Sequence, residues 1–122
     1  DKLVACSAAL QTVEIRHAYF DHMRQEACPG DFVYFDPPYV PVSVTSNFTS
    51  YTKNGFGQLE QNMLRDLAWD FKEQGVNVIL SNADHPLVRD LYGKFSLRRI
   101  EVGRAINCNG KARGSVGEVV IS

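Results

Sequence analysis

The 122-residue sequence has few of the features that mark membrane, exported or metal-binding proteins. Its longest apolar runs have the length of strands, far short of the ~20 residues of a membrane-spanning helix. Residues 1–4 lack the charged lead and apolar block of a signal peptide. The three cysteines, Cys6, Cys28 and Cys108, are widely spaced and form no C-x-x-C motif. These absences predict a cytoplasmic protein with free thiols, no membrane contact and no metal site.

Acidic and basic residues are unevenly distributed, although the net charge is only −1. The stretch from Lys94 to Arg113 holds six basic residues and one acidic residue, whereas the rest of the chain holds seven basic and thirteen acidic residues. Such a basic stretch is compatible with a polyanionic partner. It is also typical of a solvated surface, so a motif has to decide between the two interpretations.

The apolar pattern along the chain predicts an α/β domain. Short apolar runs alternate with helical patterns, as in a parallel sheet covered by helices. The last two expected strands have no helix between them, so they should form an antiparallel hairpin. Strands are expected over residues 13–20, 31–35, 76–81, 97–102 and 118–121, and helical segments over residues 3–10 and 21–27, from Leu59 to Gly75 and from Pro86 to Gly93.

The two later helices carry start and stop signals. Every fourth residue from Leu59 to Phe71 is apolar, which predicts an apolar stripe facing the core. Gly75 is the expected end of this helix. Pro86 suits the first turn of the next helix, and Asp84 is its expected N-cap.

The most informative stretch is Asp36-Pro37-Pro38-Tyr39, which follows the expected strand over residues 31–35. That strand is a continuous apolar run, typical of burial on both faces, and open α/β sheets bind ligands at the carboxyl ends of such strands. The prolines stiffen the turn and have no N–H groups, so their backbone offers only carbonyl oxygens. The tyrosine ring is then placed to lie over a flat group.

This arrangement suits methylation of an amino group on a planar base. The lone pair of such a nitrogen is delocalised into the ring, and two acceptors on its hydrogens would make it more nucleophilic. The Asp36 carboxylate and a rigid proline carbonyl would supply these acceptors, and Tyr39 would hold the base by stacking, worth ~1–3 kcal/mol. The base must first leave the duplex. With a sulfonium methyl donor, the protein's main task is positioning and electrostatics. A Pro-Pro turn with a satisfied aspartate is the alternative.

The motif and its surroundings resemble the Dam family of DNA adenine methyltransferases. The resemblance is collinear from Gly30 to the end of the chain, whereas the first 29 residues carry little of it. It implies a fold class: part of a Rossmann-like, S-adenosylmethionine-dependent methyltransferase sheet with a C-terminal antiparallel hairpin. The matching stretches are Gly30–Tyr39, Pro41–Ser43, Asn47–Tyr51, Leu80–Asp84, Arg104–Gly110, Arg113 and Glu118–Ile121.

The resemblance also implies S-adenosylmethionine as cofactor, double-stranded DNA as partner and the adenine amino group as acceptor. It places Asp36 at the target amino group and the cofactor, Pro37 as the carbonyl acceptor and Tyr39 on the flipped base. The predicted catalytic residues are Asp36, Pro37, Pro38 and Tyr39, and the predicted cofactor contacts are Phe35 and Asp36. The predicted DNA contacts are Ser43, Asn47, Thr49, Tyr51, Arg104, Asn107, Asn109, Lys111 and Arg113, of which the last five equally suit a solvated surface or the cofactor side.

Ser81 and Asn82, at the end of the strand expected over residues 76–81, have two interpretations. They are common residues for an N-cap and turn. The resemblance suggests instead that they shape the adenine pocket.

Several parts of the family pattern are absent. The sequence has no glycine loop for the cofactor in a strand–loop–helix context, no acid for the ribose and no separate segment that reads bases. In the family these parts precede the Asp-Pro-Pro-Tyr strand, which predicts a fragment that binds the donor poorly alone. Unpaired strand edges would then invite a second copy or the missing N-terminal half.

Two other functions remain open from the sequence. A Pro-Pro-Tyr corner also serves enzymes that methylate a protein glutamine or an RNA base, although Asp36 and the stretch Asn47–Thr49 favour adenine in DNA. A non-catalytic DNA-binding remnant would use only the basic stretch from Lys94 to Arg113. The DNA recognition sequence and a restriction partner are not predicted.

Overall fold

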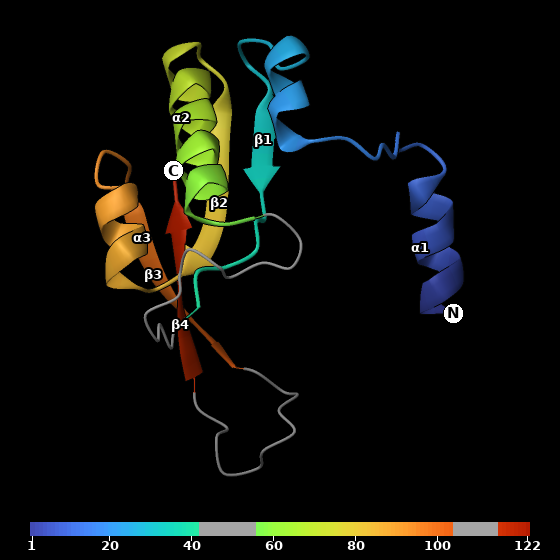
Figure 1. Cartoon of the computed structure of the whole chain (residues 1–122). Helices are drawn as coiled ribbons and strands as arrows, with labels where there is room; N and C mark the ends of the chain where they lie inside the picture. Colours follow the sequence, from blue (N-terminus) through green and yellow to red (C-terminus); the bar gives the residue numbers. More distant parts are fainter. Residues whose placement is uncertain (42–55, 104–114) are drawn as a thin grey trace.

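The computed structural model describes residues 1–41, 56–103 and 115–122. Their secondary structure forms a four-stranded mixed sheet with helices against it (Figure 1). The elements are α1 (Lys2–Leu10), the 3₁₀ helix η1 (Phe20–Gln25), β1 (Phe32–Phe35), α2 (Gln58–Glu73), β2 (Asn77–Ala83), α3 (Pro86–Leu91), β3 (Leu97–Gly103) and β4 (Ser115–Ile121). The predicted α/β character is confirmed.

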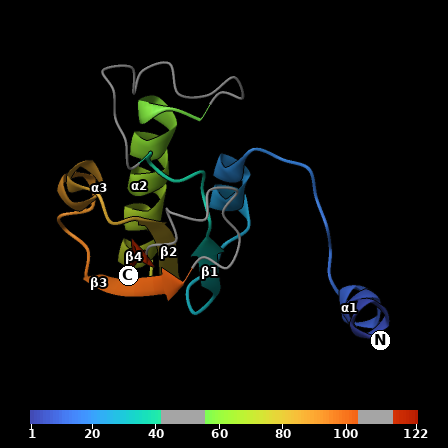
Figure 2. The same cartoon turned by 90° about the horizontal axis from the view of Figure 1, so that it is seen from below.

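The sheet has the strand order β1-β2-β4-β3. β1 and β2 are parallel, with Phe35 opposite Leu80, so their carboxyl ends lie side by side. β4 pairs antiparallel with both β2 and β3. Figures 1 and 2 show α2 packed against one face of this sheet, with α3 beside it. The parallel strands β1 and β2, with α2 packed on them, therefore position residues 36–40, the corner that follows β1.

Helix α2 buries one face, which contains the second half of the predicted stripe but not its start. Leu64, Leu67 and Phe71 are buried, whereas Leu59 at the start of the predicted stripe is 65% exposed. Four residues turn an α-helix by about 400°, so a strict four-residue spacing drifts off the core face. A buried stripe needs alternating steps of three and four, and Gln61 occupies the position three residues before Leu64.

The predicted boundary signals of α2 and α3 are confirmed with one exception, whereas the segment predicted over residues 21–27 is the 3₁₀ helix η1, which ends at Gln25. Gly75, at φ +83°, ends α2 in the left-handed region that glycine tolerates best. Pro86 starts α3 as predicted, but His85 is the N-cap, and its Nδ1 accepts a hydrogen bond from the Leu87 N–H at 3.2 Å. The predicted cap, Asp84, instead forms ion pairs with Arg89 of α3 and Arg99 of β3.

The strand predicted over residues 13–20 is wrong. The chain there has no regular structure before η1, and Ile15 is 76% exposed. Alternating apolar residues form a strand only where a neighbour pairs their backbone groups, and none of the described strands does so. α1 is a helix, as expected for residues 3–10, but it buries no residue and stands apart from the sheet in both views (Figures 1 and 2).

Burial of β1 on both faces is also wrong. Val33 and Phe35 are buried toward α2, whereas Phe32 and Tyr34 on the other face are 63% and 55% exposed. β1 lies at the edge of the sheet with one described neighbour, and no described helix covers its second face. None of the described helices is long and apolar enough to cross a membrane.

Candidate active site

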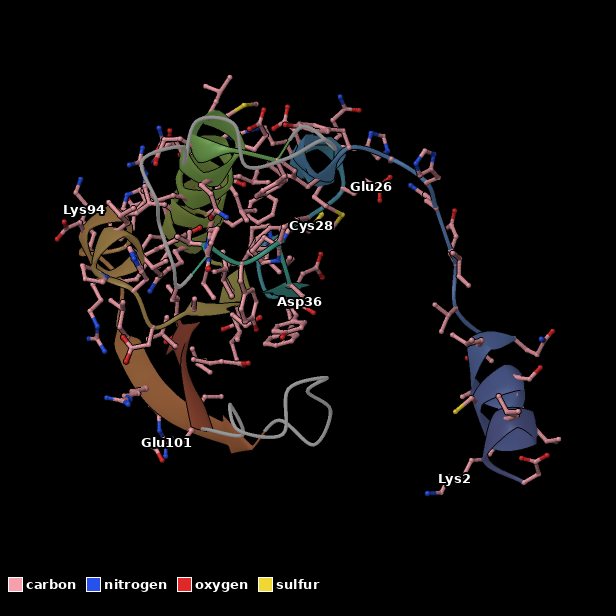
Figure 3. The ribbon with its side chains drawn as sticks, turned by 60° about the horizontal axis from the view of Figure 1, so that its bottom comes forward. Lys2, Glu26, Cys28, Asp36, Lys94 and Glu101 are labelled. Carbon is pink, nitrogen blue, oxygen red and sulfur yellow. The ribbon has the colours of Figure 1, made fainter. Side chains whose placement is uncertain are left out.

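Asp36 leaves the carboxyl end of β1 and lies beside the end of β2 (Figure 3). Ser81 of β2 donates a hydrogen bond from Oγ to Asp36 Oδ1 at 3.0 Å. The Tyr34 hydroxyl is also 3.0 Å from Ser81 Oγ. Because the single Ser81 hydrogen points to Asp36, Tyr34 is the donor in that second bond. The hydroxyls thus form a relay that fixes one carboxylate oxygen, while Oδ2 has no hydrogen-bond partner among the described residues.

Tyr39 lies half-buried at the other end of the corner. Its hydroxyl donates to Glu118 Oε2 on β4 at 3.4 Å, a long and weak bond. Burial raises the pKa of Tyr39, and the nearby carboxylates of Glu118 and Asp36 raise the pKa further. The ring therefore stays neutral near pH 7, as a stacking surface requires.

The backbone on both sides of Tyr39 is bound by side-chain amides. Gln61 of α2 donates from Nε2 to the Pro38 carbonyl at 2.9 Å. Asn82 of β2 accepts from the Val40 N–H at 3.0 Å. No described residue donates to the Pro37 carbonyl, so the two acceptors predicted for the amino group, Asp36 and the Pro37 carbonyl, remain available at the corner.

A cavity of about 400 Å³ opens beside this corner. Half of its lining residues are aromatic, and Asp36 contributes the carboxylate. Phe35, a predicted cofactor contact, lines it together with four aromatic residues that were not predicted as site residues: Tyr34 of β1, and Tyr19, Phe20 and Phe56 from outside the motif. The full lining is Ala18, Tyr19, Phe20, Tyr34, Phe35, Asp36, Pro37, Pro38, Phe56 and Leu64. No periodicity or motif distinguishes Tyr19, Phe20 and Phe56, because they approach the motif only in the fold.

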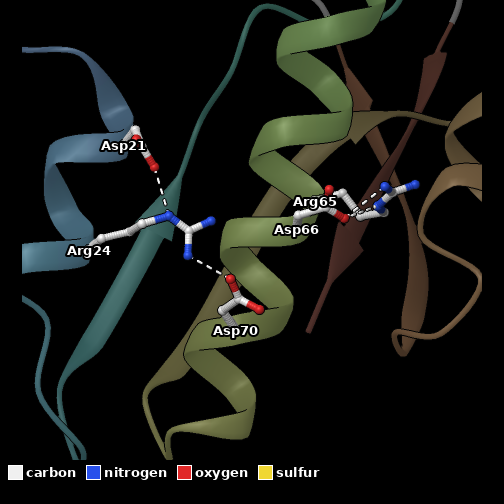
Figure 4. Close-up of polar contacts among 5 residues, drawn as sticks. All are labelled: Asp21, Arg24, Arg65, Asp66 and Asp70. Carbon is white, nitrogen blue, oxygen red and sulfur yellow. Dashed lines mark hydrogen bonds and ion pairs between the residues drawn. The ribbon is translucent and has the colours of Figure 1, made fainter.

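The wall formed by η1 is tied to α2 by Arg24 (Figure 4). Arg24 Nε donates to Asp21 at 2.8 Å within η1, and Nη1 donates to Asp70 of α2 at 2.6 Å. Asp70 is the main reason that the pKa of Arg24 is raised. All three side chains are more than 40% exposed, so this tie is worth about 0–1 kcal/mol. Packing of Phe20 against the core also holds η1 in place.

A larger cavity, of about 640 Å³, lies away from the Asp36 corner. Phe32 and Asn77, the first residues of β1 and β2, line it together with Gly75. It therefore lies at the amino ends of the parallel strands. Open α/β sheets bind their ligands at the carboxyl ends, where Asp36 and Ser81 lie.

The predicted DNA contacts lie outside the described residues: Ser43, Asn47, Thr49, Tyr51, Arg104, Asn107, Asn109, Lys111 and Arg113. Part of the basic stretch is described. Lys94 lies 5.6 Å from the centre of the Trp69 ring, and Arg99 pairs with Asp84 and Glu101. Arg99 is thus already balanced by carboxylates. The described residues contain no cluster of His, Cys, Asp and Glu that could hold a metal ion.

Comparisons with known proteins agree on one family. Residues 1–106 match the model of the D12 class N6 adenine-specific DNA methyltransferases, so the first 29 residues belong to the match, contrary to expectation. The type II methyltransferase M1.LlaDCHI of Lactococcus lactis subsp. cremoris is 41% identical over 111 residues, which are 91% of this chain and 39% of the relative.

Two relatives bear the name DNA adenine methylase. The Vibrio cholerae serotype O1 protein is 43% identical over 89 residues, 72% of this chain and 32% of its own length. The Escherichia coli K12 protein is 38% identical over 103 residues, 84% of this chain and 37% of its own length. The chain thus spans between about a third and two fifths of these relatives. By its sequence match and its Asp-Pro-Pro-Tyr corner, the chain belongs to the D12 class of N6 adenine-specific DNA methyltransferases.

Proposed function

We propose that the protein containing this chain transfers a methyl group from S-adenosylmethionine to the exocyclic amino group of adenine in DNA. The observation that carries this proposal is the hydrogen bonding of the Asp36 carboxylate. Ser81 holds one carboxylate oxygen, and the other has no partner among the described residues, beside an aromatic cavity at the carboxyl ends of β1 and β2. Family membership supports the same reaction.

The chain's own residues would bind and orient the base. Asp36 Oδ2 and the Pro37 carbonyl would accept the two hydrogens of the amino group, and the neutral Tyr39 ring would stack on the flipped base. Asp36 would also be placed to accept the proton that the amino nitrogen gives up when it takes the methyl group from the sulfonium donor. Pro37 and Pro38 add no competing donors at the corner.

The cavity beside Asp36 fits the cofactor in chemistry and in size. S-adenosylmethionine, when bound, would supply a methyl group activated as a sulfonium. A carboxylate and aromatic faces both attract such a cation, and the adenine ring of the cofactor suits the walls formed by Tyr19, Phe20 and Phe35. The volume of about 400 Å³ lies within the ~300–1,000 Å³ of small-molecule sites.

The described sheet is, in this proposal, the C-terminal part of a Rossmann-like methyltransferase sheet, with β3 and β4 as its terminal antiparallel pair. Support comes from the parallel pair β1–β2 followed by the antiparallel β4 and β3. The free edge of β1 and the exposed Phe32 and Tyr34 provide a surface for either the N-terminal half or a second copy. Without the N-terminal half or a second copy, the chain is expected to bind the donor poorly.

An acceptor panel tests the proposal. The full-length protein is incubated with S-adenosylmethionine and, separately, with unmethylated duplex DNA, RNA or a glutamine-containing peptide, and mass spectrometry locates the methyl group. N6-methyladenine in DNA is expected. Methylated RNA or glutamine would favour those acceptors instead, and DNA binding without any transfer would favour a non-catalytic DNA-binding module.

A further inference from the structure

Helix α2 carries a buried amide where its amphipathic pattern calls for an apolar residue. Gln61 is 3% exposed and lies on the same face as Leu64, Leu67 and Phe71. A buried amide is tolerated only when its polar atoms are hydrogen-bonded. Both polar atoms of Gln61 are bonded: Nε2 donates to the Pro38 carbonyl at 2.9 Å, and Oε1 accepts from Asn82 Nδ2 at 3.3 Å.

The orientation of both amides follows from the backbone around them. Asn82 is fully buried, and the N–H groups of Val40 and Ala83 point to its Oδ1 at 3.0 and 2.8 Å. Two donors identify that atom as the oxygen, so the Asn82 nitrogen faces Gln61. The facing atom of Gln61 must then be its oxygen, which directs its nitrogen to Pro38. Three hydrogen bonds therefore run in one direction: the Val40 N–H donates to Asn82, Asn82 donates to Gln61, and Gln61 donates to the Pro38 carbonyl.

This chain of hydrogen bonds begins and ends at the backbone groups on either side of Tyr39. The Pro38 carbonyl belongs to the peptide group before Tyr39, and the Val40 N–H belongs to the peptide group after it. Ladder hydrogen bonds stop with β1 at Phe35, and neither Pro37 nor Pro38 has an N–H with which to hold the turn. Side-chain amides from α2 and β2 supply what the corner's own backbone lacks.

We propose that Gln61 is a positioning residue for methyl transfer, acting through the corner that it binds. With Asn82 it fixes the two peptide groups around Tyr39 and so the direction of the Tyr39 ring. It also commits the Pro38 carbonyl to α2, which leaves the Pro37 carbonyl as the backbone acceptor for the target amino group. This inference rests on the proposed function and adds to it a residue outside the Asp-Pro-Pro-Tyr motif.

The variant Gln61→Glu separates positioning from packing because it changes only one atom of the amide. A carboxylate can still accept from Asn82, but it cannot donate to the Pro38 carbonyl. A protonated carboxyl can donate, and burial raises the pKa of a carboxyl group, so donation should return as the pH falls. Gln58→Glu is the matched control, since Gln58 is exposed on the first turn of the same helix and bonds only to Asn62 among the described residues.

The test measures kcat and KM for methyl transfer to DNA by the full-length wild type and both variants, from about pH 6 to about pH 8.5. At the upper end, Gln61→Glu should lose about 100-fold in kcat, the cost of a misplacement near 1 Å, with little change in KM for S-adenosylmethionine. At the lower end the loss should shrink at least about tenfold. At each pH, the kcat of the variant is divided by the kcat of the wild type. This ratio removes the pH dependence that both proteins share through the other titratable groups on the surrounding elements, namely Glu60, Arg65, Asp36, Tyr39 and Glu118.

Thermal unfolding of each variant shows whether it is folded. If Gln61→Glu does not fold, Gln61→Asn takes its place: it keeps the amide but shortens the reach, and the same fall in kcat without a change in KM is expected. A wild-type kcat in whichever of these variants folds, or a loss in Gln61→Glu that does not depend on pH, would overturn the positioning role. A wild-type protein that transfers no methyl group would instead overturn the proposed function, and this inference with it.

Discussion

Two irregular segments of the chain, residues 14–19 and residues 36–40, differ in what holds them. Neither contains a helix or strand, and both lie next to aromatic residues of the same cavity wall. The first is exposed, and its ion pairs, such as Arg16 with Glu14 and Glu26, are on the surface. The second is bound at Asp36, Pro38 and Val40 by side chains from α2 and β2. The two segments thus differ in whether side chains of neighbouring elements bind them.

The largest effect should follow a change at Asp36. Asp36→Ala removes the acceptor for the target amino group and should lower kcat by about 1,000-fold or more. Ile15→Ala is the matched control in the exposed segment and should leave kcat within twofold, roughly the spread of neutral surface changes. Steady-state methyl transfer measures both. DNA affinity at fixed salt should change little in either variant, because phosphate contacts dominate it.

The next effect concerns stability. Asn82→Ala leaves the Val40 and Ala83 N–H groups and the Gln61 oxygen without their partner, so it should lower the free energy of unfolding by about 3 kcal/mol. Asn77→Ala, at the exposed start of the same strand, should cost less than about 1 kcal/mol. Urea denaturation of the two variants gives the comparison. Equal losses would contradict the idea that the corner is held by buried amides.

Ser81 should matter more than the tyrosine behind it. Ser81→Ala releases Asp36 Oδ1, which should lower kcat about tenfold, whereas Tyr34→Phe removes only the second bond of the relay and should lower kcat less. Both rates come from the same methyl-transfer assay. A larger loss in Tyr34→Phe than in Ser81→Ala would contradict the relay, because Tyr34 would then act on the site other than through Ser81.

The smallest effect is expected at the tie between η1 and α2. Arg24→Ala removes an exposed pair with Asp70 and should lower the free energy of unfolding by less than about 1 kcal/mol. High salt should lower the stability of the wild type toward that of the variant, because salt screens surface charges. Thermal unfolding at low and high salt measures the difference. A loss that is independent of salt would point to packing of the Arg24 side chain instead.

The sequence predicted those features that one segment can encode by itself. β1, β2, β3 and the helices around Gly75 and Pro86 follow from local patterns, and the Asp-Pro-Pro-Tyr corner follows from its motif and family resemblance. β4 begins at Ser115, three residues earlier than predicted, because its pairing with Gly103 extends it. Pairing between strands determines that boundary, and a local pattern does not record it.

The features that sequence reasoning missed depend on distant partners. Residues 13–20 alternate like a strand but have no strand beside them among the described residues. Gln61 resembles an ordinary polar residue of a surface helix until Pro38 and Asn82 are placed against it. Tyr19 and Phe20 are neighbours in the sequence, but they meet Phe56 and the Asp36 corner only at the cavity. In each case the fold, rather than the local pattern, decides the role.

In the proposed function, the corner at Asp36 directs a methyl group to the amino nitrogen of adenine. The most direct measurement is a single-turnover reaction of the full-length protein with isotopically labelled S-adenosylmethionine and unmethylated duplex DNA, followed by mass spectrometry of the digested nucleosides. We expect label on the N6 nitrogen of adenine, and none when Asp36 is replaced by alanine. Label on another base, or equal label with and without the Asp36 carboxylate, would contradict the proposed function.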